Sequence, residues 1–161
     1  MNSINDLLIK LGSYNTLLVV LSFLILLGLN DKQSMRFSGV TAAFYIIANL
    51  YFDYLLAWDA ANLYRYFVWF SHDLLWMGVI AYLGLRDKVN FQQSVFGQLL
   101  CLPILCLNLL RAIDMAVGKF NFSLAPYQVI YPICESAIVV LCWVPIFVAL
   151  KNKLLQRQLV A

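Results

Sequence analysis

Apolar residues form five long runs along the chain, and short polar segments separate them. A helix needs about 20 mostly apolar residues to cross the roughly 30 Å hydrocarbon core of a bilayer. The pattern therefore predicts an all-α, polytopic integral membrane bundle that forms a single transmembrane domain over residues 1–161. We expect five transmembrane helices, at residues 14–29, 37–58, 63–85, 95–117 and 127–150. A short basic tail at residues 151–161 should continue the last helix.

The composition agrees with a membrane setting. Charged residues make up 12% of the chain, against about 25% in an average soluble domain. The net charge is only +3, and no basic run is interleaved with aromatic residues. This argues against a nucleic-acid partner. The partner that the composition predicts is the lipid bilayer.

Basic residues divide unevenly between the two ends of the expected bundle. Lys and Arg concentrate in cytoplasmic loops, so we expect the N-terminus outside and the C-terminus in the cytoplasm of a bacterial inner membrane. Seven basic residues fall on the expected inner side: Lys32, Arg36, Arg86, Lys88, Lys151, Lys153 and Arg157. Four fall on the outer side: Lys10, Arg65, Arg111 and Lys119.

Polar and ionisable residues inside the expected helices are the main candidates for function. A charged side chain at the bilayer centre costs roughly 2.5–3.5 kcal/mol on insertion scales. Nearly all of those in this chain fall in the outer half of the bundle or at its centre. We therefore predict a polar outer half and a dry inner half. The cluster that could bind a ligand or ion, or serve a structural role, comprises Asn49, Asp53, His72, Asp73, Asn108, Arg111, Asp114 and Glu135.

Arg111 is the strongest single candidate in this cluster, because its guanidinium stays charged and must find a partner or reach water. We expect it to pair with Asp53 or Glu135 inside the bundle, while Asp114 supplies a second partner nearer the surface. Two alternatives are a purely structural salt bridge and a helix end at which Arg111 and Asp114 both reach the head groups.

His72 and Asp73 are consecutive, so their side chains should point about 100° apart on a helix. We expect that both cannot face one cavity squarely. A single histidine without a second histidine or a nearby cysteine is a poor basis for a metal site or haem ligation, and we expect no metal and no cofactor. The alternatives are a buried, hydrogen-bonded histidine and a protonatable group that senses pH.

Three prolines lie inside the expected helices and predict kinks or local unwinding. They are Pro103, Pro132 and Pro145. Between the first two helices, Asn30 and Asp31 should end one helix and begin the next.

Sequence motifs of known enzymes are missing from the chain. It has no Gly-rich phosphate loop, no G-x-S-x-G and no H-E-x-x-H. Ser71, His72 and Asp73 have the residue types of a catalytic triad, but consecutive positions cannot align a nucleophile, its base and an orienting acid. We therefore expect no enzymatic activity.

Two kinds of function remain. The first is a non-enzymatic membrane protein that acts as a homo-oligomer, or as a subunit of a complex with a partner membrane or cytoplasmic protein, in sensing, scaffolding or immunity. The alternative is a cation or proton channel, or a small transporter. Its acidic, outward-facing vestibule would be lined by Asp53, Asp73, Arg111 and Glu135.

Overall fold

The computed structural model describes residues 2–59, 63–117 and 121–160, and side chains from Tyr14 to Gln156 within these ranges. The described residues form five helices and no strand. The all-α class that the apolar runs predict is therefore confirmed. In chain order the helices are α1 (Asn2–Leu29), α2 (Lys32–Trp58), α3 (Tyr64–Leu85), α4 (Phe91–Val117) and α5 (Leu124–Val160).

Length and apolar character make this a fold suited to lipid. Within the described residues, α2, α3, α4 and α5 are long and apolar enough to cross a membrane, whereas the apolar part of α1, Tyr14–Leu29, is shorter. Large apolar side chains such as Leu85 and Phe147 project from the outside of the bundle. A soluble protein rarely exposes so much contiguous apolar surface.

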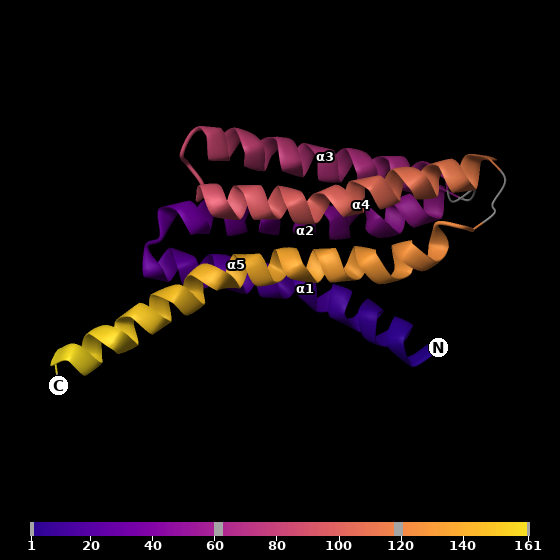
Figure 1. The fold of residues 1–161 in the computed structure, drawn as a ribbon. Helices are drawn as coiled ribbons and strands as arrows, with labels where there is room; N and C mark the ends of the chain where they lie inside the picture. Colours follow the sequence, from indigo (N-terminus) through magenta and orange to yellow (C-terminus); the bar gives the residue numbers. More distant parts are fainter. Residues whose placement is uncertain (1, 60–62, 118–120, 161) are drawn as a thin grey trace.

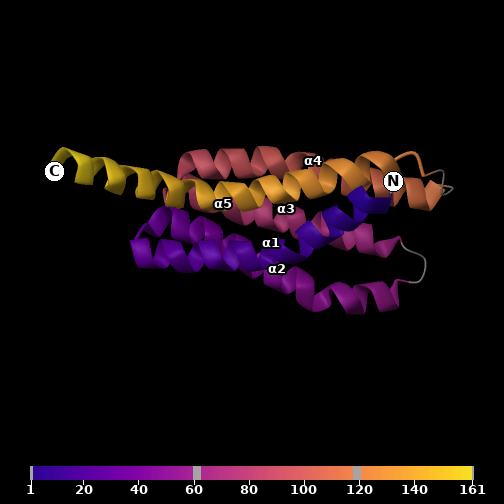
Figure 2. The same ribbon diagram turned by 90° about the horizontal axis from the view of Figure 1, so that it is seen from below.

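Consecutive helices run antiparallel to one another, so α1 and α5 run in the same direction, and the N- and C-termini lie at opposite ends of the molecule (Figure 1). Contacts are most extensive between α3 and α4, α4 and α5, α1 and α2, and α1 and α5. Helix α2 makes far fewer contacts with α3, and its C-terminal half leans away from α5 (Figure 2). The bundle is therefore least tightly packed along one side of α2.

Most helices begin earlier than the apolar runs predict, because their polar first turns are already helical. Asn30 adopts a positive φ of 59° and ends α1, as expected. Asp31 then caps α2, and its carboxylate accepts a hydrogen bond of 3.1 Å from the backbone N–H of Ser34. At the other end of the chain, α5 continues to Val160, so the tail is helical as far as the structure describes it.

The expected bends at the prolines are only partly observed. Helices α4 and α5 stay helical through all three prolines, and α5 changes direction in its C-terminal half (Figure 1). Pro145 has no N–H to bond the carbonyl of Leu141 one turn earlier. Gln93 of α4 compensates for this, since its side-chain amide donates to that carbonyl at 3.2 Å. A neighbouring side chain thus replaces the lost backbone bond, and unwinding is avoided.

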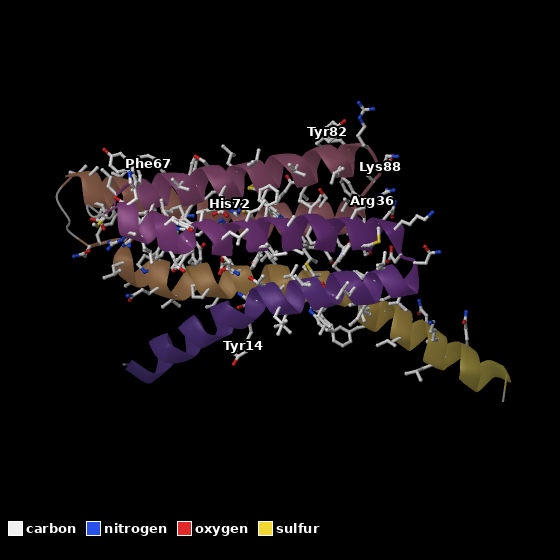
Figure 3. The ribbon with its side chains drawn as sticks, turned by 180° about the vertical axis from the view of Figure 1, so that it is seen from behind. Tyr14, Arg36, Phe67, His72, Tyr82 and Lys88 are labelled. Atoms are coloured by element: carbon white, nitrogen blue, oxygen red, sulfur yellow. The ribbon has the colours of Figure 1, made fainter. Side chains whose placement is uncertain are left out.

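One end of the bundle, which we call the basic end, carries the connectors 30–31 and 86–90. Arg36 and Lys88 lie together there, and α5 leaves the bundle from the same end (Figures 1 and 3). Gln33 and Arg36 donate side-chain hydrogen bonds of 3.2 Å to the carbonyls of Asp87 and Lys88. These bonds join α2 to the α3–α4 connector. Lys119 and the side chains of Lys10 and Arg157 lie outside the described part of the chain.

The half of the bundle nearest the basic end has large apolar side chains at its centre. Phe37, Trp76 and Ile80 are fully or almost fully buried there. A Cβ atom at Gly97 would lie 3.1 Å from the rings of Phe37 and Trp76, so glycine permits the close approach of α4. Uncharged polar side chains such as Thr41 are buried beside them, and no charged side chain is buried among the described residues of this half. The expectation that this half is dry stays a prediction.

Candidate functional site

The opposite half of the bundle, which we call the outer half, contains a cavity of about 590 Å³. All five helices contribute to its wall. This volume lies within the roughly 300–1,000 Å³ that is usual for small-molecule sites. The polar side chains that line the cavity are Thr16, Asn49, His72, Asp73, Gln128 and Glu135.

Aromatic rings make up much of the rest of the wall. They come from α2, α3 and α5, so the rings surround the space on several sides. Ala48, Ile104 and Ile138 add aliphatic surface. The cavity therefore combines an apolar wall with a few polar groups, as ligand sites commonly do. The aromatic lining residues are Phe44, Tyr45, Phe52, Trp69, Trp76, Tyr127 and Tyr131.

His72 and Asp73 both line this cavity, which corrects the expectation that they could not share one. The cavity reaches from α2 to α4, and each residue borders a different side of it. His72 Nε2 lies 3.2 Å from the carbonyl oxygen of Phe44 on α2. Asp73 Oδ2 accepts a hydrogen bond of 2.9 Å from Asn108 on α4. The two side chains still contact each other, with 3.4 Å between His72 Nδ1 and Asp73 Oδ1.

Aromatic rings pack around the imidazole of His72, which lies in the middle part of the bundle (Figure 3). The ring centroids of Phe44, Tyr51 and Trp69 lie 5.1, 5.9 and 6.1 Å from that of the imidazole. The faces of aromatic rings attract positive charge at such distances. A cation at this place would be attracted by those rings that turn a face toward it.

Glu135 enters the cavity from α5, opposite α3. The hydroxyl of Tyr45 donates to the backbone carbonyl of Glu135 at 3.4 Å, which links α2 to α5 beside the carboxylate. The lining residues include the carboxylates of Asp73 and Glu135 and no lysine or arginine among the described residues. The formal charge of the wall is therefore negative, and the cavity should attract cations.

Arg111 does not belong to this cavity, and its expected pairing with Asp53 or Glu135 is wrong. It forms a buried ion pair with Asp114, in which Nη1 lies 3.0 Å from Oδ2. The same guanidinium donates to Asn121 Oδ1 at 3.1 Å and to the Tyr66 hydroxyl at 3.4 Å. Ser123 closes the network, since its hydroxyl donates to Asp114 Oδ2 at 2.7 Å.

Local geometry explains why Arg111 pairs with Asp114 and not with Asp53 or Glu135. Residues three apart on a helix are neighbours, and the α4–α5 connector returns Asn121 and Ser123 to the same place. Glu135 lies roughly 16 Å along α5 from its first residue, deeper than Arg111 is from the end of α4. The alternative in which Arg111 and Asp114 reach water is also wrong, because both are more than nine-tenths buried.

The remaining predicted residues occupy three different places. Asn108 lies behind Asp73 and is fully buried. Asn49 lies at the rim of the cavity, where its amide donates to the hydroxyl of Thr16 on α1 at 2.8 Å. Asp53 is exposed on the outside of α2, about 8 Å from the end of that helix. From there its carboxylate can reach the interface, so it is not part of the site.

Asp59 orders the connector between α2 and α3, outside the membrane-spanning segments. Its carboxylate accepts hydrogen bonds from the backbone N–H groups of Leu63 and Arg65 at 3.2 and 2.9 Å. Burial alone would raise the pKa of this carboxyl, but the hydrogen bonds favour the charged form and hold the pKa below its ordinary value. Asp59 is therefore a structural residue.

The aromatic wall is the part of the site that the sequence analysis missed. A spacing signal was present, since Tyr127, Tyr131 and Glu135 are each four residues apart and share one face of α5. On α2, Tyr45 and Asn49 have the same spacing. In an apolar helix these aromatic residues look no different from lipid-facing ones.

Comparisons of the chain with protein-family models, with curated proteins and with solved structures found no match. Within the described residues, no group of three or more His, Cys, Asp or Glu side chains is placed to hold a metal ion. The cavity in the outer half is therefore the basis for assigning a function.

Proposed function

We propose that this protein is a non-enzymatic membrane protein that binds a small organic cation in the cavity of its outer half. The observation that carries the proposal is the wall of that cavity, which places Asp73 and Glu135 among aromatic rings and contains no lysine or arginine among the described residues. Carboxylates supply attraction for a positive charge, and ring faces add to it. The apolar remainder of the wall fits a ligand with a hydrophobic body.

An open channel for inorganic cations is less well supported. Such a channel needs a polar path across the whole membrane. In the half nearest the basic end, Phe37, Trp76 and Ile80 are buried, and no charged side chain is buried among the described residues. A cavity that is closed on that side suits a ligand that is held in place. The expected action as an oligomer or as a subunit of a larger complex stays a prediction.

The proposal includes an orientation in a bacterial cytoplasmic membrane. The basic end would face the cytoplasm, because Lys and Arg are enriched in cytoplasmic loops. The outer half, with the cavity, would then face the periplasm together with the N-terminus.

Isothermal titration calorimetry on the protein in phosphatidylcholine nanodiscs tests the proposal. The probe is tetraphenylphosphonium, and tetraphenylborate, an anion of the same shape, is the matched control ligand. We expect saturable binding of the phosphonium and much weaker binding of the borate. Glu135→Gln and Asp73→Asn should each weaken phosphonium binding about tenfold, since a hydrogen bond or contact to a charged group contributes about 1.5–3 kcal/mol.

Asp53→Asn is the control variant, because it removes a carboxylate from the exposed side of α2 and should leave the affinity unchanged. Absence of saturable binding, or equal affinity for the two probes, would contradict the proposal. So would an equal loss of affinity in Asp53→Asn.

A further inference from the structure

We propose that the His72–Asp73 pair holds one exchangeable proton, and that an organic cation binding in the cavity displaces this proton into solution. This inference rests on the proposed function and makes cation binding proton-linked. It is carried by the positions of the hydrogen-bond acceptors around the imidazole.

The acceptors fix where protons must be. The carbonyl oxygen of Phe44 can only accept, so His72 Nε2, 3.2 Å away, must carry a hydrogen. His72 Nδ1 faces Asp73 Oδ1 at 3.4 Å. A hydrogen bond between these two atoms needs one proton, either on the imidazolium or on the carboxylic acid. In both forms the pair holds one proton more than it would if the imidazole were neutral and the carboxylate ionised.

The wall holds the pair in this arrangement. Asn108 donates to Asp73 Oδ2 at 2.9 Å, so that oxygen is occupied and Oδ1 is the one directed toward His72. The rings of Phe44, Tyr51 and Trp69 enclose the imidazole. An incoming cation would meet the same carboxylate and the rings of Phe44 and Trp69, which also line the cavity.

Two positive charges cannot share this space at low cost, because the Coulomb repulsion between them is poorly screened away from water. When a cation approaches Asp73, the carboxylate is neutralised by the ligand, and the proton leaves the cavity for solvent. The imidazole then remains neutral, with its Nε2 hydrogen still bonded to Phe44. Charge is balanced, since one positive charge enters as one leaves.

Other titratable groups face the pair from the neighbouring helices. From α2 they are Tyr45 and Tyr51, from α4 Cys101, and from α5 Tyr127, Tyr131 and Glu135. The lining residue from α1, Thr16, does not titrate. Glu135 is the one carboxylate in this set, so it is the competing source of a released proton and must be tested separately.

The test measures protons directly on the wild-type protein. Tetraphenylphosphonium is mixed with nanodisc-bound protein in weakly buffered solution containing a pH indicator, and its affinity is measured by calorimetry from pH 5.5 to 8.5. We expect release of about one proton per bound cation. Over the range where release is complete, the apparent affinity should rise about tenfold per pH unit.

The His72→Gln variant shows whether the released proton comes from the His72–Asp73 pair. Glutamine keeps a polar side chain beside Asp73 but cannot hold an exchangeable proton. We expect this variant to keep its affinity within a few-fold at high pH, with release reduced several-fold and a flatter pH dependence. Glu135→Gln should keep the release per cation bound. The melting temperature of each variant shows whether it is folded.

The outcomes separate the inference from the proposed function. Saturable binding without proton release and without pH dependence would overturn the inference and leave the function standing. Release that persists in His72→Gln and disappears in Glu135→Gln would overturn the assignment to this pair. Absence of binding at every pH would remove the proposed function, and the inference with it.

Discussion

Arg111 shows how a single buried charge is accommodated in this fold. Its guanidinium contacts the start of α3 through Tyr66, its own helix through Asp114, and the connector before α5 through Asn121. Asp114 is satisfied in turn by Ser123. The network therefore joins α3 and α4 to the connector that leads into α5, and it keeps the guanidinium out of the cavity beside it.

This network gives a prediction for stability. Arg111→Ala should lower the melting temperature substantially, because it leaves the Asp114 carboxylate buried without its ion partner. In an Asp114→Asn background, Arg111→Ala should lower the melting temperature much less, since the two residues act as one unit. Thermal unfolding in detergent, followed by scanning fluorimetry, measures both effects.

The matched control is Arg111→Ala combined with Asp53→Asn, two residues that do not meet in the structure. Their effects should add. Additive effects for Arg111 with Asp114 would contradict the network, as would strong coupling between Arg111 and Asp53.

At the scale of the element, α5 shows how a proline is tolerated within a long apolar helix. The carbonyl of Leu141, which Pro145 leaves without its usual partner, accepts a hydrogen bond from Gln93. Because this pairing connects α4 and α5, the proline also fixes how these two helices lie against each other. A buried carbonyl without any partner would be costly.

A double-mutant cycle tests this compensation. Gln93→Leu should destabilise the wild-type protein by about 1–3 kcal/mol, the cost of leaving a buried acceptor unsatisfied. In a Pro145→Ala background the alanine N–H can bond Leu141, so the same change should cost little. Chemical unfolding in mixed micelles gives the two values. Equal losses in both backgrounds would show that Gln93 acts in some other way.

Helix positions were largely predictable from the sequence, whereas side-chain partners were not. The apolar runs located all five helices, because hydropathy depends only on local composition. The first turns of α2, Lys32–Arg36, contain a single apolar residue, Met35, so the apolar run does not predict the early start of this helix.

Asp114 could be predicted as a partner of Arg111 from the spacing of three residues. The contact of Arg111 with Asn121 depends on how the α4–α5 connector folds back, and His72 meets Phe44 through helix packing. Neither of these two contacts is encoded in spacing along one helix.

At the scale of the whole molecule, the two ends differ in chemistry and in packing. The basic end is closed by an apolar core and by side-chain bonds between α2 and the α3–α4 connector. The outer half contains the acidic, aromatic cavity. This asymmetry matters only if the two ends face different compartments, and that is open to experiment.

Single-cysteine labelling tests the orientation. The native Cys101, Cys106, Cys134 and Cys142 are first replaced by alanine. In intact spheroplasts a membrane-impermeant maleimide should label Tyr64→Cys and Phe122→Cys, which lie at the outer end and are exposed. Lys88→Cys and Lys153→Cys should react only after the membrane is opened.

Labelling of Lys88→Cys in intact spheroplasts would show that the orientation is the opposite of the proposed one. Labelling of Lys88→Cys and Lys153→Cys from opposite sides would contradict the bundle itself, because α5 leaves from the end that carries the α3–α4 connector (Figure 1).

The bonds that Gln33 and Arg36 make at the basic end also have a mechanical consequence. They fix α2 at its first turns, whereas farther along its length α2 meets α3 through aromatic side chains, such as Tyr51 and Phe52 against Trp69. Phe52 lies roughly 24 Å along the helix from Arg36, so a tilt of about 5° about the hydrogen-bonded end would displace it by about 2 Å. Because Phe52 lines the cavity, such a tilt would change the width of the cavity while the basic end kept its contacts.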